Sequence, residues 1–217
     1  MLDAKIYHTF RNIPVSGTIL AEEIGRVLQN RPYANPAAKM MDLERANIVV
    51  RLKKGLYVLN ASDFGYPLSA AVCSNAIYGP SYLSEQWALS YYGLIPERVR
   101  TLTAITTKHG RTFENKLGNF IYSQVEATYF SIGITTTLID TASVLVATPE
   151  KALADLILTD SNVPANSVVA LSRYLAEDIR LDMEALPSFN TQVLAECAAK
   201  GRKTSTLNNL IKLIQKQ

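Results

Sequence analysis

The chain has 217 residues, 48% of them hydrophobic and 19% charged. These proportions are typical of a folded, water-soluble protein with one large domain or two small ones, and they exclude disorder over most of the chain. No apolar run reaches the roughly 18 residues that a membrane span needs. The first residues, Met1–Arg11, lack the apolar core of a signal peptide. We therefore expect a cytoplasmic protein with no membrane partner.

The positive charge of the chain lies at its two ends. The formal net charge is +3, but residues 1–60 carry +4, residues 61–199 carry −6 and residues 200–217 carry +5. A basic end is more often a solvated face than a nucleic-acid surface, yet it raises nucleic acid as a partner. The basic tail after residue 199 is compatible with either role, because it either adds non-specific contacts or solubilises a terminal helix.

The first sixty residues predict three short helices followed by a β-hairpin. Thr18 is a good N-cap for the second helix, and Asn35-Pro36 is a clear start for the third. This order is typical of a winged helix-turn-helix, whose third helix enters the major groove of DNA and whose hairpin is the wing. The expected elements are helices over 1–11, 18–30 and 36–47 and strands over 48–52 and 56–59.

The rest of the chain predicts an α+β domain. The turn-rich segment Asn60–Pro67 has the composition of a linker, which few contacts should cross. We expect a domain over 1–60 and a second domain over 67–217, with a mainly antiparallel sheet and C-terminal helices. The expected elements are helices over 68–78, 82–92 and 148–158, strands over 99–106, 119–125, 129–134 and 143–146, and helices after residue 167.

Few residues suggest catalysis or metal binding. His8 and His109 have no second histidine or cysteine at ligand spacing, and His109 is most simply a hairpin turn residue. No phosphate-binding glycine loop or nucleophile elbow is present. Asp140, Glu150 and Asp155 show no diagnostic spacing, and the last two suit the first turn and the exposed face of a helix. We expect no catalytic residue, no cofactor and no metal, and therefore not an enzyme.

Two other groups of residues are better explained by packing than by chemistry. Cys73 and Cys197 have alanine neighbours on apolar helix faces, so we expect two buried, unreactive thiols. Five aromatic residues have helical spacing, which favours a core with hydroxyl groups near the surface over a platform for nucleic-acid bases. They are Tyr78, Tyr82, Trp87, Tyr91 and Tyr92.

The hairpin and the helix before it carry the cations expected to bind DNA. Phosphate neutralisation needs cations at the ends of rigid elements, and these elements supply five. Asn35, Ala38, Lys39 and Asp42 are the positions expected to face bases, although the carboxylate of Asp42 disfavours close approach to phosphates. A winged helix that binds protein instead remains the alternative. The expected DNA-binding residues are Asn35, Lys39, Arg45, Arg51, Lys53 and Lys54.

Three motifs lie along the chain in a distinctive order. They are the hairpin RLKKGLYVL at 51–59, the segment GPSYLSEQWALSYYGLIPE at 79–97 and the segment ATPEKALADL at 147–156, which follows strand-like residues around 130–134. In order and spacing they resemble the AbiEi-type antitoxins of bacterial type IV toxin–antitoxin systems. The resemblance extends from about Ile6 to about Leu158.

The resemblance implies a protein with two activities. An N-terminal winged helix would bind repeats upstream of its own operon and repress it, with Lys39, Arg45, Arg51, Lys53 and Lys54 contacting the DNA. The second domain would neutralise a toxin of the nucleotidyltransferase superfamily without a stable complex. No catalytic residue is implied. The polar members of the matching motifs are expected to have structural roles: Ser81 capping a helix, Glu85 in its first turn, Glu150 at a helix start, and Lys151 with Asp155 as an i,i+4 pair.

Two other functions remain open from the sequence. One is a winged-helix transcriptional regulator whose second domain senses a small ligand. The other is a nuclease-like or nucleotide-modifying enzyme with a DNA-targeting module, which would need a cleft where carboxylates converge.

Overall fold

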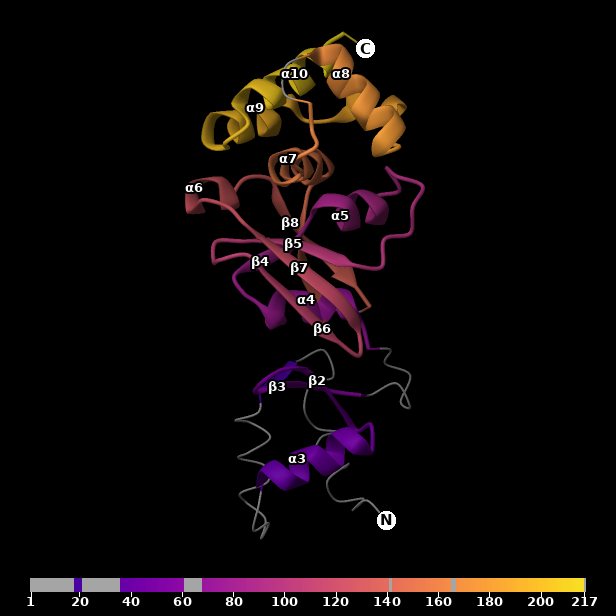
Figure 1. The fold of residues 1–217 in the computed structure, drawn as a ribbon, viewed down its shortest axis with the longest axis vertical. Coiled ribbons are helices and arrows are strands. Elements are labelled where there is room, and N and C mark those ends of the chain that lie inside the picture. Colours follow the sequence, from indigo (N-terminus) through magenta and orange to yellow (C-terminus); the bar gives the residue numbers. More distant parts are fainter. Residues whose placement is uncertain (1–17, 21–35, 61–67, 141, 165–166, 217) are drawn as a thin grey trace.

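The computed structural model describes residues 18–20, 36–60, 68–140, 142–164 and 167–216. The helix expected over 1–11, Asn35 and most of the expected linker lie outside these residues. The described parts follow one long axis: an N-terminal sheet with a helix, a six-stranded mixed sheet with helices on both faces, and a C-terminal helical layer (Figure 1). The chain is thus an α+β protein with C-terminal helices.

A helix and a hairpin form most of the described N-terminal part. Helix α3 (Pro36–Arg45) begins at the proline, whose fixed φ suits the first helical position. The hairpin consists of β2 (Val49–Lys53) and β3 (Leu56–Leu59). Its turn contains Gly55 at φ +79°, a left-handed conformation that favours glycine. The third helix and the hairpin expected from the sequence are confirmed.

The segment that begins at Thr18 is a strand and not the start of a helix. Strand β1 (Thr18–Leu20) pairs antiparallel with β3, with Ile19 opposite Tyr57, which completes a sheet of order β1-β3-β2. The β-branched residues Thr18 and Ile19 favour an extended backbone once a partner strand is present. The helix prediction was wrong here because the partner strand lies almost forty residues away in the sequence.

The second sheet has the order β6-β7-β5-β4-β9-β8. Among the described residues, three neighbouring pairs are antiparallel (β4–β5, β6–β7 and β8–β9) and two are parallel (β5–β7 and β4–β9). The sheet is therefore mixed, with antiparallel pairs in the majority. Its strands are β4 (Ser81–Leu83), β5 (Leu102–Thr106), β6 (Arg111–Asn115), β7 (Gly118–Gln124), β8 (Ile134–Ile139) and β9 (Ala142–Ala147).

Three sequence predictions for this sheet are corrected by the structure. Strand β4 occupies the start of the helix expected at 82–92, and all three of its side chains are buried, so no alternation marked it as a strand. The strand expected at 129–134 is replaced by helix α6 (Ala127–Phe130) and by β8, which starts later. His109 lies between β5 and β6, which are not neighbours in the sheet, so it is not in a hairpin turn.

Helices cover both faces of the second sheet (Figure 1). One face carries α4, and the other carries α5 and α7, with the C-terminal helices stacked beyond α7. The apolar core lies between these layers, and both cysteines are buried in it, as expected. The elements are α4 (Ala70–Ile77), α5 (Glu85–Tyr91), α7 (Pro149–Thr159), α8 (Val168–Arg173), the π-helix η2 (Tyr174–Asp178), the 3₁₀-helix η3 (Met183–Ser188), α9 (Thr191–Lys200) and α10 (Thr204–Ile214).

The hairpin of the N-terminal part contacts the second part directly. Asn115 of β6 donates a side-chain hydrogen bond to the carbonyl oxygen of Leu52 at 3.0 Å. Leu52 and Leu56 belong to the same buried apolar cluster as the core of the second part. The hairpin is therefore held against β6 and α4 although a linker-like segment separates the two in the sequence.

We predict that Leu52→Ala lowers the stability of the whole chain by about 2 to 5 kcal/mol, the usual cost of such a cavity in a core. Leu52 is 2% exposed in the shared cluster, so thermal unfolding should remain one transition at a lower temperature. The control is Leu138→Ala, because Leu138 is 70% exposed and should change stability by less than about 0.5 kcal/mol. A main transition that Leu52→Ala leaves unchanged would mean that the hairpin folds separately.

Candidate functional site

The cations expected to bind DNA have different surroundings. Arg51 and Lys54 are exposed on the hairpin. The side chain of Arg45 is 73% exposed at the end of α3 and forms an ion pair with Asp42 at 3.6 Å, while Lys39 on the same helix is partly buried. Because both partners of the Arg45 pair are exposed, the pair contributes little and leaves the guanidinium accessible.

Lys53 points toward the second part of the molecule. Its ammonium group donates a hydrogen bond to the carbonyl oxygen of Ile77 at 2.5 Å, at the C-terminal end of α4. It also lies 6.0 Å from the centroid of the Phe113 ring. Burial lowers the pKa of Lys53, and the nearby cations Lys108 and Arg111 lower it further. Lys53 therefore lies at the junction between the hairpin and the second part, whereas Arg51 and Lys54 are exposed.

Two cations of the second part join Lys53 at this junction. The ammonium group of Lys108 donates to the carbonyl oxygen of Gly79 at 2.5 Å, and Arg111 lies 5.4 Å from the centroid of the Phe113 ring. In the described part of the chain, none of the three forms an ion pair with a carboxylate. The second part therefore places two further cations beside Lys53 of the hairpin.

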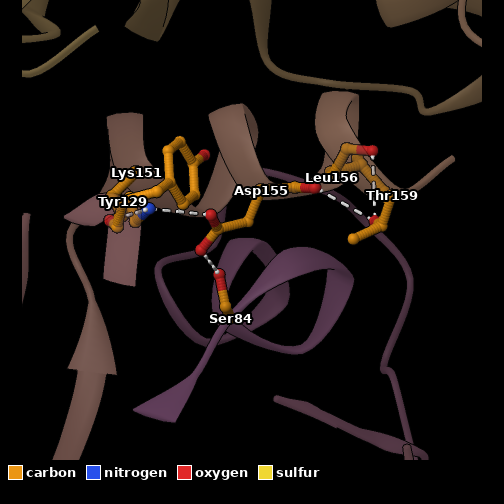
Figure 2. Close-up of polar contacts among 6 residues, drawn as sticks. All are labelled: Ser84, Tyr129, Lys151, Asp155, Leu156 and Thr159. Carbon is orange, nitrogen blue, oxygen red and sulfur yellow. Dashed lines mark hydrogen bonds and ion pairs between the residues drawn. The ribbon is translucent and has the colours of Figure 1, made fainter. Parts of the chain in front are cut away.

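A second group of polar residues is fully buried and surrounds an ion pair on α7. Lys151 and Asp155 are 2.9 Å apart, and both side chains are 0% exposed. Ser84 donates a hydrogen bond to the second oxygen of Asp155 at 2.6 Å, and Lys151 donates to the carbonyl oxygen of Tyr129 at 3.4 Å (Figure 2). The pair thus connects α7 to the residue before α5 and to α6.

Aromatic rings complete the surroundings of Lys151. Its ammonium nitrogen is 3.2 Å from the centroid of the Tyr129 ring and 5.7 Å from that of Tyr82. A ring face attracts a cation strongly where water is excluded. Burial raises the pKa of both tyrosine hydroxyls, and the carboxylate of Asp155 raises it further, so both stay protonated. The cluster therefore combines one cation, one carboxylate, a serine and two tyrosines, all of them buried.

The sequence predicted different positions for several of these residues. Asp155 is buried and not on an exposed helix face, because α7 is buried continuously from Lys151 to Ile157 between the sheet and the C-terminal helices. Ser81 lies in β4, and Ser84 occupies the position before α5 that Ser81 was expected to fill. The alanine-rich sequence of α7 is the one signal that could have indicated close packing on all sides.

Glu85, the first residue of α5, has an unusual environment. Its side chain is buried, and its φ of +55° is a left-handed conformation that is uncommon for residues other than glycine. Burial raises its pKa to about 7, and the charge of Asp155 adds to the increase, while the hydroxyls of Thr159 and Ser123 oppose it. The sequence predicted Glu85 in a first helical turn but not its burial.

The buried cluster can connect elements but cannot reach a substrate, because Lys151 and Asp155 have no exposed surface. Burial also raises the pKa of Cys73 to about 12 and of Cys197 to about 11, which makes both thiols poor nucleophiles. The described residues contain no group of three His, Cys, Asp or Glu side chains arranged to hold a metal ion. No helix among them has the length and apolar character that a bilayer span requires.

The fold of this chain is similar to that of a protein of known structure. No family model matches the sequence, and no curated protein matches it. The crystal structure of the RV2827C protein from Mycobacterium tuberculosis is similar, with a TM-score of 0.53 and 12% sequence identity over 99% of this chain and 80% of that chain. At this identity the similarity shows the fold alone, and it extends over both parts of the molecule.

We predict that Lys151→Met destabilises the protein by about 3 to 5 kcal/mol, because it leaves the carboxylate of Asp155 buried without its cation. The double variant Lys151→Met/Asp155→Leu should be more stable than the single variant, since it removes both charges. Urea unfolding of the three proteins measures this difference. A double variant less stable than the single one would show that Asp155 is needed for its bond with Ser84 and not for the ion pair.

Proposed function

We propose that this protein is an autoregulating antitoxin of the AbiEi type, which represses its own operon and neutralises a nucleotidyltransferase-like toxin. The observation that carries the proposal is a buried contact between two of the three motifs on which the family resemblance rests. Ser84, in the motif at 79–97, and Asp155, in the motif at 147–156, are 71 residues apart in the sequence and share a buried hydrogen bond. The bond between Ser84 and Asp155 therefore joins these two motifs in the interior of the protein.

The proposed DNA-binding unit is a winged helix over residues 1–60. Its support is the order of α3, β2 and β3 together with the pairing of β1 to β3, which is the strand arrangement that a winged helix requires. The exposed cations of α3 and the hairpin would contact DNA, with α3 as the reading helix. The cations Lys108 and Arg111 add positive charge beside Lys53 of the hairpin, which supports nucleic acid over protein as the partner.

A ligand-sensing transcriptional regulator is the second candidate. The observation that favours it is a cavity of about 220 Å³ in the second part, lined by both polar and apolar side chains. The two candidate functions can be told apart by experiment, because only the antitoxin acts on the product of a neighbouring toxin gene.

We predict that Arg51→Ala/Lys54→Ala weakens binding to all DNA sequences similarly. Two lost phosphate contacts should reduce the slope of log K against log salt by about two units, measured by fluorescence anisotropy. Arg173→Ala is the control, because Arg173 is exposed on α8 and paired with Glu177, and it should leave the slope unchanged. An unchanged slope in the double variant would remove the hairpin from the DNA interface.

We also predict that the full chain restores growth of cells that express the neighbouring nucleotidyltransferase-like toxin. Arg51→Ala/Lys54→Ala should restore growth equally but lose repression of a reporter driven by the upstream promoter, because its changes lie outside the second part. Growth rate and reporter output measure the two activities. A soluble, folded chain that gives no rescue would refute the antitoxin function, and repression without rescue would favour the ligand-sensing regulator.

A further inference from the structure

The hairpin strand β2 is irregular next to Lys53. Arg51 lies opposite Tyr57 and Lys53 lies opposite Leu56, so the register of β2 against β3 shifts between Arg51 and Lys53. A shift of this kind inserts an extra residue into one strand and changes the direction of the side chains beside it. The irregularity therefore lies at the lysine whose ammonium group reaches out of the hairpin to the second part of the molecule.

The C-terminal end of helix α4 receives this ammonium group. The last turn of α4 contains no basic residue of its own. The last carbonyl groups of a helix lack intrahelical partners and carry the negative end of its dipole, so they favour a cationic donor. Lys53 donates a hydrogen bond at 2.5 Å to the carbonyl oxygen of Ile77, the final residue of α4. Lys53 thus caps a helix that ends 24 residues further along the chain.

The cap is formed although the surroundings disfavour a positive charge. Burial lowers the pKa of Lys53, and the charges of Lys108 and Arg111 lower it further. The face of the Phe113 ring, 6.0 Å from the ammonium nitrogen, offers a weaker attraction than the carbonyl group. The bond to Ile77 is therefore the main direct contact that holds the charged end of Lys53 at the junction.

We propose that Lys53 is a positioning residue for DNA binding and not a phosphate contact, because its ammonium group fixes the hairpin to the end of α4. Its exposed neighbours Arg51 and Lys54 bind phosphates from a hairpin that is already held in place. Fixing the hairpin before DNA arrives reduces the loss of conformational entropy on binding. The proposal rests on the proposed DNA binding of the hairpin, whereas the attachment of the hairpin to α4 can be measured without DNA.

The first test compares Lys53→Met with Lys54→Met in the full chain. Methionine keeps an unbranched apolar side chain and removes the charge. The probe is a fluorescent DNA duplex of the upstream promoter. Lys54→Met should reduce the slope of log K against log salt by about one unit, since it loses one phosphate contact. Lys53→Met should lower affinity by about tenfold at every salt concentration and leave the slope unchanged, because only a charge-assisted bond within the protein is lost.

Two results of this comparison would overturn the proposal. A slope that falls by about one unit in Lys53→Met would make Lys53 a phosphate contact like Lys54. An affinity that Lys53→Met leaves unchanged would show that its bond to Ile77 has no effect on DNA binding. Circular dichroism checks that both variants are folded. Lys53→Arg keeps a cationic donor and should restore the affinity, and an arginine variant as weak as Lys53→Met would contradict the proposal.

Hydrogen exchange of the free protein tests the attachment separately. The backbone amides of β2 and β3 should exchange faster in Lys53→Met than in Lys54→Met, because a hairpin without the cap opens locally more often. Equal exchange in the two variants would refute the attachment even in a protein that binds DNA. Faster exchange in Lys53→Met in a protein that binds no DNA would confirm the attachment but refute both the proposed DNA binding and the role of Lys53 in it.

Discussion

The ion pair between Lys151 and Asp155 is the constraint on which the second part of the molecule depends. Burying two charges is costly unless each has further partners, because the desolvation of the ions must be offset by direct contacts. Here Lys151 has the carbonyl and the ring of Tyr129, and Asp155 has the hydroxyl of Ser84. Each partner comes from a different element, so the demand for charge compensation fixes α5 and α6 relative to α7.

The residue that follows Ser84 has an unusual backbone conformation and a raised pKa, and both occur next to the ion pair. Ser84 precedes α5 directly, and Glu85 follows it in a left-handed conformation. The negative charge of Asp155 also contributes to the raised pKa of Glu85, after burial itself. A local backbone strain of this kind persists only where surrounding contacts hold it. The buried pair and the left-handed backbone at Glu85 therefore lie side by side, joined through Ser84.

The hairpin links this second part to the N-terminal part. Apolar side chains of β2 and β3 enter the common core, and Lys53 and Asn115 form hydrogen bonds across the junction in opposite directions. Such contacts hold the exposed cations of the hairpin at a set position relative to Lys108 and Arg111.

The sequence by itself determined the α+β class, helix α3, the hairpin after it and helix α7, because these rest on local signals such as Asn35-Pro36, Lys54-Gly55 and Thr148-Pro149. It also indicated the two buried cysteines. Only the tertiary structure decided that Thr18–Leu20 is a strand, that the sheet is mixed, and that Lys151, Asp155 and Glu85 are buried. The physical reason is that strand pairing and the burial of charge depend on partners far along the chain. A lysine and an aspartate at i,i+4 have the same spacing on an exposed helix face and in a core, and only the elements packed around them determine which it is.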